Sequence, residues 1–429
     1  SQIPLSLEAT QGSEGEGGTM VNDNYDTLVN TILVVSMLYI VNHVMKWSNT
    51  KETLKKHWHF LGYHLARRRL ERLIQQQCFN DNQNDENNHT KNTTKEGSFP
   101  VVSGIYVYPV KSCRAVSLST SKIDLLGLLH DRRLMLVRPN VIDPTAILNT
   151  NNENTILPTH RFLTQRQAPM LATITASVPN DEEKDMITMT HQPTNTQLQV
   201  CTSLTHIQTL STRYYAGIWD DVVQVVDMGD QAATFFQTIL KSDNDWNVDS
   251  SYENVRLVSI LPTTERHTDE QFIPMVGYQP QHGVPHVALT DGYPILIASE
   301  TSLNELNRRL EQKGKSKILM NRFRPNIVLS NIPKPFEEDT WKTILIGNVL
   351  FHLVKACPRC KQSCTDQMTG ERFEEPLETL AEFRKADKDG IDVYFAMNAI
   401  IGDQVHFTKR KEKNHNDEDI MKMISVGDK

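Results

Sequence analysis

The chain has 429 residues, of which 38% are hydrophobic, and this is enough for two packed domains. Its formal net charge of −7 argues against nucleic acid as the main partner, because phosphate binding needs a concentrated basic face. The six cysteines are not spaced like a disulfide framework, which favours a reducing compartment.

Two contrasting segments open the chain. Residues 1–27 are acidic and contain no Lys or Arg, whereas residues 28–45 carry no fixed charge and are mostly Leu, Val, Ile and Met. As a helix, the second segment would reach about 27 Å, close to the roughly 30 Å hydrocarbon core of a bilayer. We predict a transmembrane anchor at 28–45, with a buried core helix as the alternative.

A basic segment and a linker follow over residues 46–99. Cations outnumber acids strongly just after the apolar run, so the positive-inside rule places the rest of the chain in the cytosol. Residues 80–97 are rich in Asn, Asp, Lys and Thr, as expected of a flexible linker. Asn88 and Asn92 begin glycosylation motifs that would stay unmodified in this topology.

The globular part begins near residue 100. Alternation over 105–109 and apolar runs at 134–137 and 171–174 predict short strands. The spacing of Phe235, Phe236, Ile239 and Leu240 predicts a helix.

We divide this part into a first domain at 100–250, a second at 251–408 and a charged tail at 409–429. In the second domain, Ser302 and Glu305 form a possible capping box at the start of a helix that Gly314 would end.

Cys357 and Cys360 form the most reactive pattern in the chain. They follow an apolar run at 344–354 and stand among two cations, Lys355 and Arg359, which would lower the thiol pKa. Such thiolates bind metals and act as nucleophiles. Buried, redox-idle cysteines are the simplest alternative. A structural zinc site is another, and its four ligands would be His352, Cys357, Cys360 and Cys364.

Six stretches, in order along the chain, resemble signature motifs of the MOSC family, named after the C-terminal domain of molybdenum cofactor sulfurase. They are Tyr108 to Cys113 (YPVKSC), Gly127 to Arg132 (GL and DR), Thr164 to Pro169 (TQRQ-x-P), Asp291 to Pro294 (DGYP), Arg322 to Asn326 (RFRPN) and Cys357 to Cys360 (CPRC). The resemblance implies an α+β chain. A mixed α/β MOSC N-terminal domain would be followed by a β-barrel-like MOSC domain, with one N-terminal membrane helix.

The same resemblance implies a molybdenum cofactor, Mo-molybdopterin. In such proteins the pterin phosphate is held at the positions of Lys111, Ser112, Arg132 and Arg324, with Tyr293 and Asn326 nearby. Arginine and lysine suit this task because they offer charge-assisted hydrogen bonds to phosphate.

Cys360 matches the position of the family's metal ligand, and Arg359 would tune the site from outside the metal's own ligands. Asp291 and Asp366 are candidate proton donors or orienting groups. Cys364 is an extra thiol where the related reductases have none.

The implied activity is the reduction of N-hydroxylated compounds such as amidoximes and hydroxylamines. Electrons would come from NADH through cytochrome b5 reductase and cytochrome b5. This chain has no Gly-rich nucleotide-binding fingerprint, which fits an outside electron source. The implied location is the mitochondrial outer membrane, with the catalytic part facing the cytosol.

Two other functions stay open. One is a non-catalytic cofactor carrier or sulfur-transfer module, similar to the C-terminal part of the cofactor sulfurase. We expect that protein to resemble this chain only in the MOSC half, and its pyridoxal-phosphate-dependent part has no room in this chain. The other is a membrane scaffold held together by the zinc site described above.

Overall fold

The computed structural model describes residues 99–140, 156–179, 185–241, 251–269, 272–273, 284–385, 391–402 and 422–429. The predicted anchor at 28–45, the acidic start and the basic linker lie outside these residues. Within the described ranges, no helix is long and apolar enough to cross a membrane.

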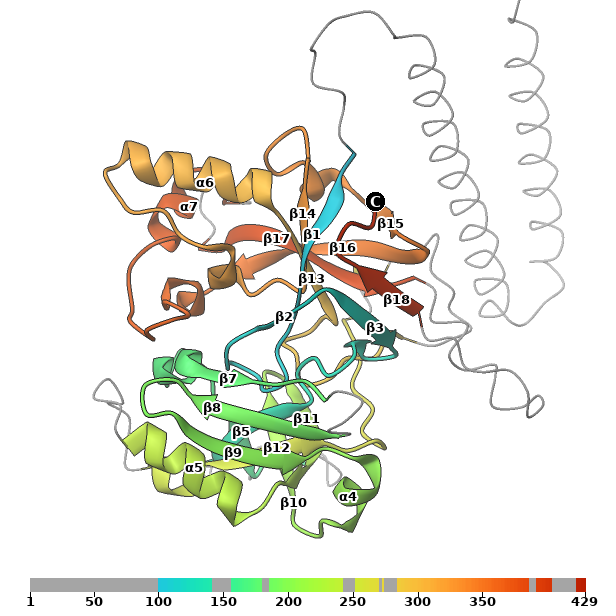
Figure 1. The fold of residues 1–429 in the computed structure, drawn as a ribbon, viewed down its shortest axis with the longest axis vertical. Helices are drawn as coiled ribbons and strands as arrows, with labels where there is room; N and C mark the ends of the chain where they lie inside the picture. Colours follow the sequence, from blue (N-terminus) through green and yellow to red (C-terminus); the bar gives the residue numbers. More distant parts are fainter. Residues whose placement is uncertain are drawn as a thin grey trace, which may run out of the picture. The chain divides into compact units, whose positions relative to one another are not determined.

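A closed barrel of five strands forms much of the first half of the described chain (Figure 1). The run Leu134–Val137 is apolar throughout because strand β5 is buried on both faces. Leu134 and Leu136 pack in one cluster with a helix, and Met135 and Val137 pack in a second cluster on the other face. In barrel order the strands are β10 (Arg213–Ile218), β11 (Asp221–Asp227), β12 (Arg256–Ile260), β5 (Leu134–Pro139) and β6 (His160–Phe162).

A three-stranded sheet and helix α5 (Asp230–Lys241) share the outer core of this half. Phe236 and Leu240 of α5 are fully buried beside Leu134 and Leu136, so the predicted helix is confirmed. The sheet contains β7 (Ile174–Ala176), β8 (Met186–His191) and β9 (Thr196–Cys201), and α4 (Leu204–Thr209) follows it.

A seven-stranded sheet forms the second half. Helices α6 (Glu300–Gln312) and α7 (Leu377–Phe383) pack on one face, where Ala298 and Phe395 are buried, and Ile295 and Ile297 are buried in the cluster on the other face. In sheet order the strands are β15 (Thr343–Ile346), β16 (Val349–Arg359), β17 (Val393–Ile401), β13 (Ile295–Ser299), β14 (Ile327–Ser330), β1 (Val101–Val107) and β2 (Val116–Leu118).

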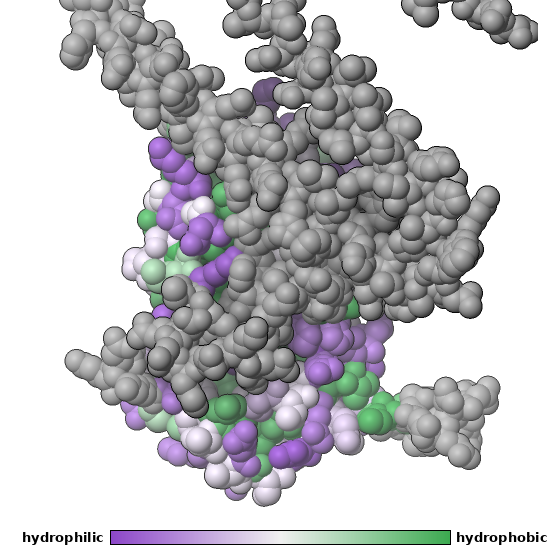
Figure 2. All heavy atoms as spheres, turned by 90° about the vertical axis from the view of Figure 1, so that its right-hand side faces the viewer, coloured by the Kyte–Doolittle hydropathy of each residue, from purple (hydrophilic) through white to green (hydrophobic). Residues whose placement is uncertain are grey.

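A small sheet and several short 3-10 helices complete the fold. The sheet consists of β18 (Lys422–Ser425), β3 (Thr120–Asp124) and β4 (Gly127–Leu128). The 3-10 helices are η1 (Pro169–Thr173), η2 (Ser251–Asn254), η5 (Met320–Phe323), η6 (Glu337–Thr340) and η7 (Lys361–Cys364). On the face shown in Figure 2, hydrophilic side chains are mixed with apolar ones over the coloured surface, as is usual for a folded protein.

The α+β class is confirmed, but the placement of the barrel was wrong. The closed barrel lies in the first half, whereas the second half contains an open sheet. Strands also cross the division that we drew at 250/251: β1 and β2 join the sheet of the second half, and β12 closes the barrel of the first. The segment 409–429 is not only a charged tail, because it includes β18, whose Ile424 is buried. Strand pairing is non-local, so alternation along the sequence identifies strands without showing their partners.

Two local predictions also need correction. Residues 171–174 mostly belong to η1, which begins at Pro169, and only Ile174 starts a strand. The cap of α6 is Ser299, whose side chain accepts a hydrogen bond from the backbone of Ser302. Ser302 itself is buried and donates to Glu338.

Candidate functional site

One pocket collects residues from both halves of the chain. Loops after β1 and before β5 contribute from the first half, and the loops around β13, β14 and β16 contribute from the second. We call it the cationic pocket because Lys111, Arg132, Arg324 and Arg359 line it. It brings together nine of the ten predicted site residues: Lys111, Ser112, Arg132, Asp291, Tyr293, Arg324, Asn326, Arg359 and Cys360.

Three of these residues have an unusual backbone. Ser112, Arg132 and Arg324 have φ values of 71°, 49° and 55°, in the left-handed region that favours glycine. A non-glycine residue held there typically costs about 1–3 kcal/mol and persists where the surrounding structure requires its side chain. The left-handed turns direct two guanidinium groups and a hydroxyl residue to one pocket.

Tyr108, at the end of the first predicted strand, contacts both arginines. The guanidinium carbons of Arg132 and Arg324 lie 4.4 and 4.3 Å from its ring centroid, and its hydroxyl donates to the carbonyl of Pro325 over 3.0 Å. Burial raises the pKa of Tyr108 to about 12, so its hydroxyl stays protonated. The aromatic ring thus stabilises two cations that would otherwise repel each other.

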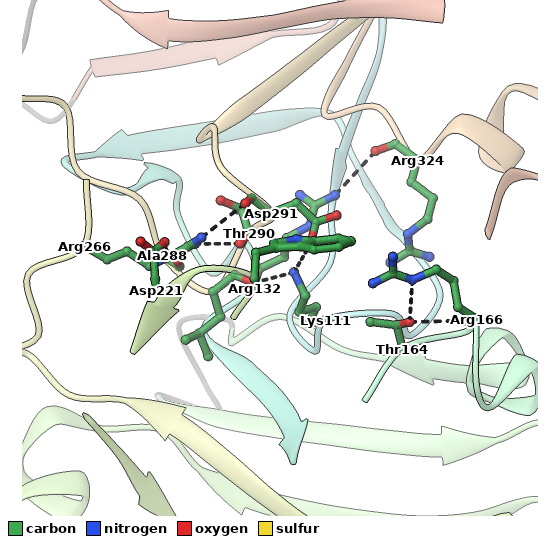
Figure 3. Close-up of polar contacts among 12 residues, drawn as sticks. Lys111, Arg132, Thr164, Arg166, Asp221, Arg266, Ala288, Thr290, Asp291 and Arg324 are labelled. Carbon is green, nitrogen blue, oxygen red and sulfur yellow. Dashed lines mark hydrogen bonds and ion pairs between the residues drawn. The ribbon is translucent and has the colours of Figure 1, made fainter. Parts of the chain in front are cut away.

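Lys111 and Asp291 form an ion pair at the pocket mouth (Figure 3). The Lys111 ammonium also donates to the carbonyl of Leu289, and the Trp219 indole N–H donates to Asp291 over 3.2 Å. Burial lowers the pKa of Lys111 to about 8. Lys111 and the Trp219 N–H hold the pKa of Asp291 well below its ordinary value. The Asp291 side chain is 65% exposed, so water screens this pair.

Arg324 is the cation with the least compensation. It is 6% exposed, and no ion pair joins it to a carboxylate of the described residues. Its Nη1 donates to Gln367 over 2.9 Å, and its Nη2 is buried without a hydrogen-bond partner. Burial lowers the pKa of Arg324 to about 10, so it is charged at neutral pH. A buried charge without an opposite charge nearby is strongly unfavourable unless a ligand neutralises it and accepts its hydrogen bonds.

Further buried donors lie around the same pocket. Thr290 Oγ1, the Tyr293 hydroxyl and Arg359 Nε are buried without hydrogen-bond partners among the described residues. Each such group loses the free energy of its hydration unless something replaces the water. Together with Arg324, they fit an anionic ligand with several acceptor atoms, as the phosphate and pterin of a molybdenum cofactor would provide.

A second layer holds the cations in place. Buried Gln165 donates to the carbonyl of Ser112 over 2.6 Å and exchanges hydrogen bonds with Gln367, which in turn contacts Arg324. The amide of Asn326 accepts from the backbone of Leu296 and donates to the carbonyl of Tyr106, so it serves as a brace between strands.

The two cysteines of the CPRC segment both line the pocket but differ in contacts. Arg359 donates to Cys357 Sγ over 3.0 Å and to the carbonyl of Phe323 over 2.8 Å. Cys360 is exposed and lies at the start of η7. Lys355 does not line this pocket; its ammonium lies 4.1 Å from the Phe272 ring centroid. Of the two cations expected to act on the thiols, Arg359 thus contacts Cys357, whereas Lys355 lies against Phe272.

The zinc interpretation fails on geometry. No three His, Cys, Asp or Glu residues in the described part of the chain are grouped so that they could hold a metal ion. Cys364 is buried and donates to the carbonyl of Glu374 over 3.2 Å, and burial raises the pKa of its thiol. His352 is buried within β16, where it pairs with Ile400 of β17.

Asp366 is the one predicted site residue outside the pocket. Its carboxylate accepts from the backbone of Met368 and Thr369 and forms an ion pair with Arg322 at 3.0 Å. Burial acts to raise its pKa, but these hydrogen bonds hold the pKa below its ordinary value. Asp366 thus organises the loop after η7.

Sequence reasoning missed four contributors: Tyr108, Gln165, Trp219 and Arg266. Arg266 is buried and donates to the carbonyls of Ala288, Thr290 and Asp291, so it fixes the segment that presents Asp291 (Figure 3). Tyr108 and Gln165 lie inside the matched motifs, and an aromatic residue next to a predicted phosphate site was the available signal. Trp219 and Arg266 lie outside those motifs, and the sequence carries no sign of them.

Comparisons with known proteins agree with this architecture. The MOSC N-terminal beta barrel domain matches residues 99–243, and the MOSC domain matches residues 284–429. Mitochondrial amidoxime reducing component 2 of Bos taurus is 31% identical over 299 residues, which cover 68% of this chain and 75% of the relative. The human mitochondrial amidoxime-reducing component 1 is 29% identical over 305 residues, covering 68% of this chain and 74% of the relative.

Cofactor sulfurases are also related. The molybdenum cofactor sulfurase of Caenorhabditis briggsae is 24% identical over 295 residues, which cover 69% of this chain and 33% of the relative. That similarity is thus not confined to the C-terminal half. With both domain matches in order along one chain, this protein belongs to the MOSC family, as a member that carries the N-terminal barrel domain and the MOSC domain together.

Proposed function

We propose that this protein is a molybdenum-cofactor-dependent reductase of N-hydroxylated compounds such as amidoximes and hydroxylamines. The observation that carries the proposal is buried Arg324, which has a nitrogen without a partner and lines the same pocket as Cys360. An anionic cofactor would satisfy Arg324, and a thiolate would suit its metal. When bound, the cofactor would supply the two-electron redox chemistry.

The residues of the pocket would then have separate roles. Arg132, Arg324, Lys111 and Ser112 would hold the phosphate and orient the pterin. Cys360 would be the protein ligand to molybdenum, because it lines the pocket while Cys357 is engaged by Arg359. Both arginines lie against the Tyr108 ring, so their positions are fixed before the ligand arrives.

Of the two ionisable groups at the pocket mouth, Lys111 is better suited to proton delivery than Asp291. The lowered pKa of Asp291 keeps it ionised at neutral pH, which fits an orienting role better than a proton-donating one. Lys111 has a pKa of about 8 and can hold or release a proton near neutral pH, at the mouth of the pocket.

The electron source and the location extend the proposal. Two relatives are named mitochondrial amidoxime reducing components. We extend this to a mitochondrial location, with the segment at 28–45 as a membrane anchor and the catalytic part facing the cytosol. Cytochrome b5 and its NADH reductase would supply the electrons.

The direct test is reduction of benzamidoxime by the purified full chain with cytochrome b5, its reductase and NADH. We expect NADH consumption that depends on this chain, together with molybdenum and pterin in the purified protein. Molybdenum and pterin without turnover would instead support a cofactor carrier or sulfur-transfer module. The similarity to sulfurases over 69% of this chain is the observation that favours this second candidate.

A further inference from the structure

A second pocket adjoins the cationic pocket and has the opposite charge. The two share Asp291, Gly292 and Tyr293 as a common wall. We call the second one the acidic pocket, because five carboxylates line it: Asp220, Asp221, Glu265, Asp269 and Asp291.

Among the described residues, two cations line the acidic pocket, and both are already engaged. Arg266 pairs with Asp221 at 2.6 Å and donates to three backbone carbonyls. Lys355 has its ammonium 4.1 Å from the Phe272 ring centroid. The formal charge of the pocket is therefore negative, so the potential favours a cation there.

Two further features fit a ligand. Thr268 is 4% exposed, lines the acidic pocket and has a hydroxyl oxygen that is buried without a hydrogen-bond partner within the described chain. Aromatic faces attract planar cations, and two aromatic residues, Trp219 and Tyr293, line the pocket. The guanidinium carbon of Arg166 already lies 4.4 Å from the Trp219 ring centroid, so this ring does accept a planar cation. Because Tyr293 and Asp291 line both pockets, the acidic pocket directly adjoins the cationic one.

We infer that the acidic pocket binds the amidinium or guanidinium group of a small aromatic or aliphatic molecule, and that Asp220 and Glu265 recognise this charge. Planar amidinium and guanidinium groups donate paired hydrogen bonds to a carboxylate. Asp220 lies in the turn between β10 and β11, and Glu265 lies after β12, so the two approach from separate elements.

This inference rests on the proposed function. It concerns whether the substrate or the product of the reaction stays bound. An amidoxime is neutral, and two electrons with two protons remove its hydroxyl oxygen as water to leave an amidine. The amidine takes one more proton and becomes a cation. The acidic pocket would therefore bind the product more tightly than a neutral substrate and produce inhibition by product.

The test is calorimetric titration of the full chain with benzamidine, a fixed amidinium, and with benzamide, its neutral counterpart. Asp220→Asn combined with Glu265→Gln should weaken benzamidine binding about 5- to 30-fold, because each screened ion pair contributes modestly. Benzamide binding should not change. Glu378→Gln, an exposed acid on α7 outside both pockets, is the matched control.

Added salt should weaken benzamidine binding to the wild type and have less effect on the double variant. Equal benzamidine affinities in the wild type and the double variant, or a benzamide affinity that equals that of benzamidine, would overturn the inference. Binding is measured without turnover, so an inactive chain that still binds benzamidine through these acids would refute the reductase proposal alone.

Discussion

The cationic and acidic pockets share a wall but place their charges in opposite ways. Lys111 and Arg324 are only 4% and 6% exposed, whereas Asp220 and Glu265 are exposed to solvent. The buried charges are held by fixed backbone turns, an aromatic ring and a second layer of amides, whereas the exposed charges need none of these. Changes in the cationic pocket should therefore have larger effects than changes in the acidic one.

The largest effect should come from the exposed thiol of the cationic pocket. Cys360→Ala should reduce benzamidoxime reduction by at least about 100-fold, because loss of a thiolate ligand alters the geometry and redox behaviour of a metal site. Pterin should remain bound, since the residues proposed to hold its phosphate lie elsewhere in the pocket. The measurement is NADH consumption together with the pterin content of the purified variant.

Cys357→Ser is the matched control for that variant. Cys357 lies three residues away in the same segment, and its sulfur accepts a hydrogen bond from Arg359. It should keep most of the activity. If both variants lose activity alike and keep the same metal content, Cys360 is not the ligand.

The next largest effect should be a pH dependence of phosphate-ester binding that comes from the lowered pKa of Lys111. Its folded-state pKa is about 8. The ammonium that would contact the phosphate is therefore present below pH 8 and is lost as the pH rises above it. Phosphate-ester affinity should fall by up to about tenfold per pH unit between pH 8 and 9.5. Lys111→Met should bind more weakly and show a flatter profile. Titrating wild type and variant with a phosphate monoester tests this, and parallel profiles would rule out Lys111.

The smallest effect concerns Asp366. Asp366→Asn should lower the free energy of unfolding by about 1–2 kcal/mol at neutral pH, because a charged acceptor of two backbone hydrogen bonds is replaced. Its folded pKa is depressed, so this stabilisation exists above pH 4 and is lost as the pH falls further. Denaturant unfolding at pH 7 and pH 3 should show the difference narrowing. A fall in pterin content would instead place Asp366 in the binding site.

Sequence reasoning located the cationic pocket because short motifs keep a charged residue and its turn together. Arg324, for example, ends η5 in a left-handed turn, and Asn326 follows two residues later. It could not show that β1 pairs with β14, more than 200 residues away, or that β12 closes the barrel. Such pairings depend on the burial of whole faces. The same limit hid Arg266 and Trp219, which reach Asp291 only after the chain has folded.

The most direct test of the cationic pocket is the pterin content and stability of Arg324→Met, with Lys361→Met as control. Lys361 is an exposed cation next to Cys360 that does not line the pocket. We expect pterin affinity to fall about 10- to 150-fold in Arg324→Met and to stay unchanged in the control. The cofactor-free Arg324→Met protein should be as stable as the wild type or more so, because an unmatched buried charge is removed. Full pterin occupancy at limiting cofactor in Arg324→Met would contradict the account.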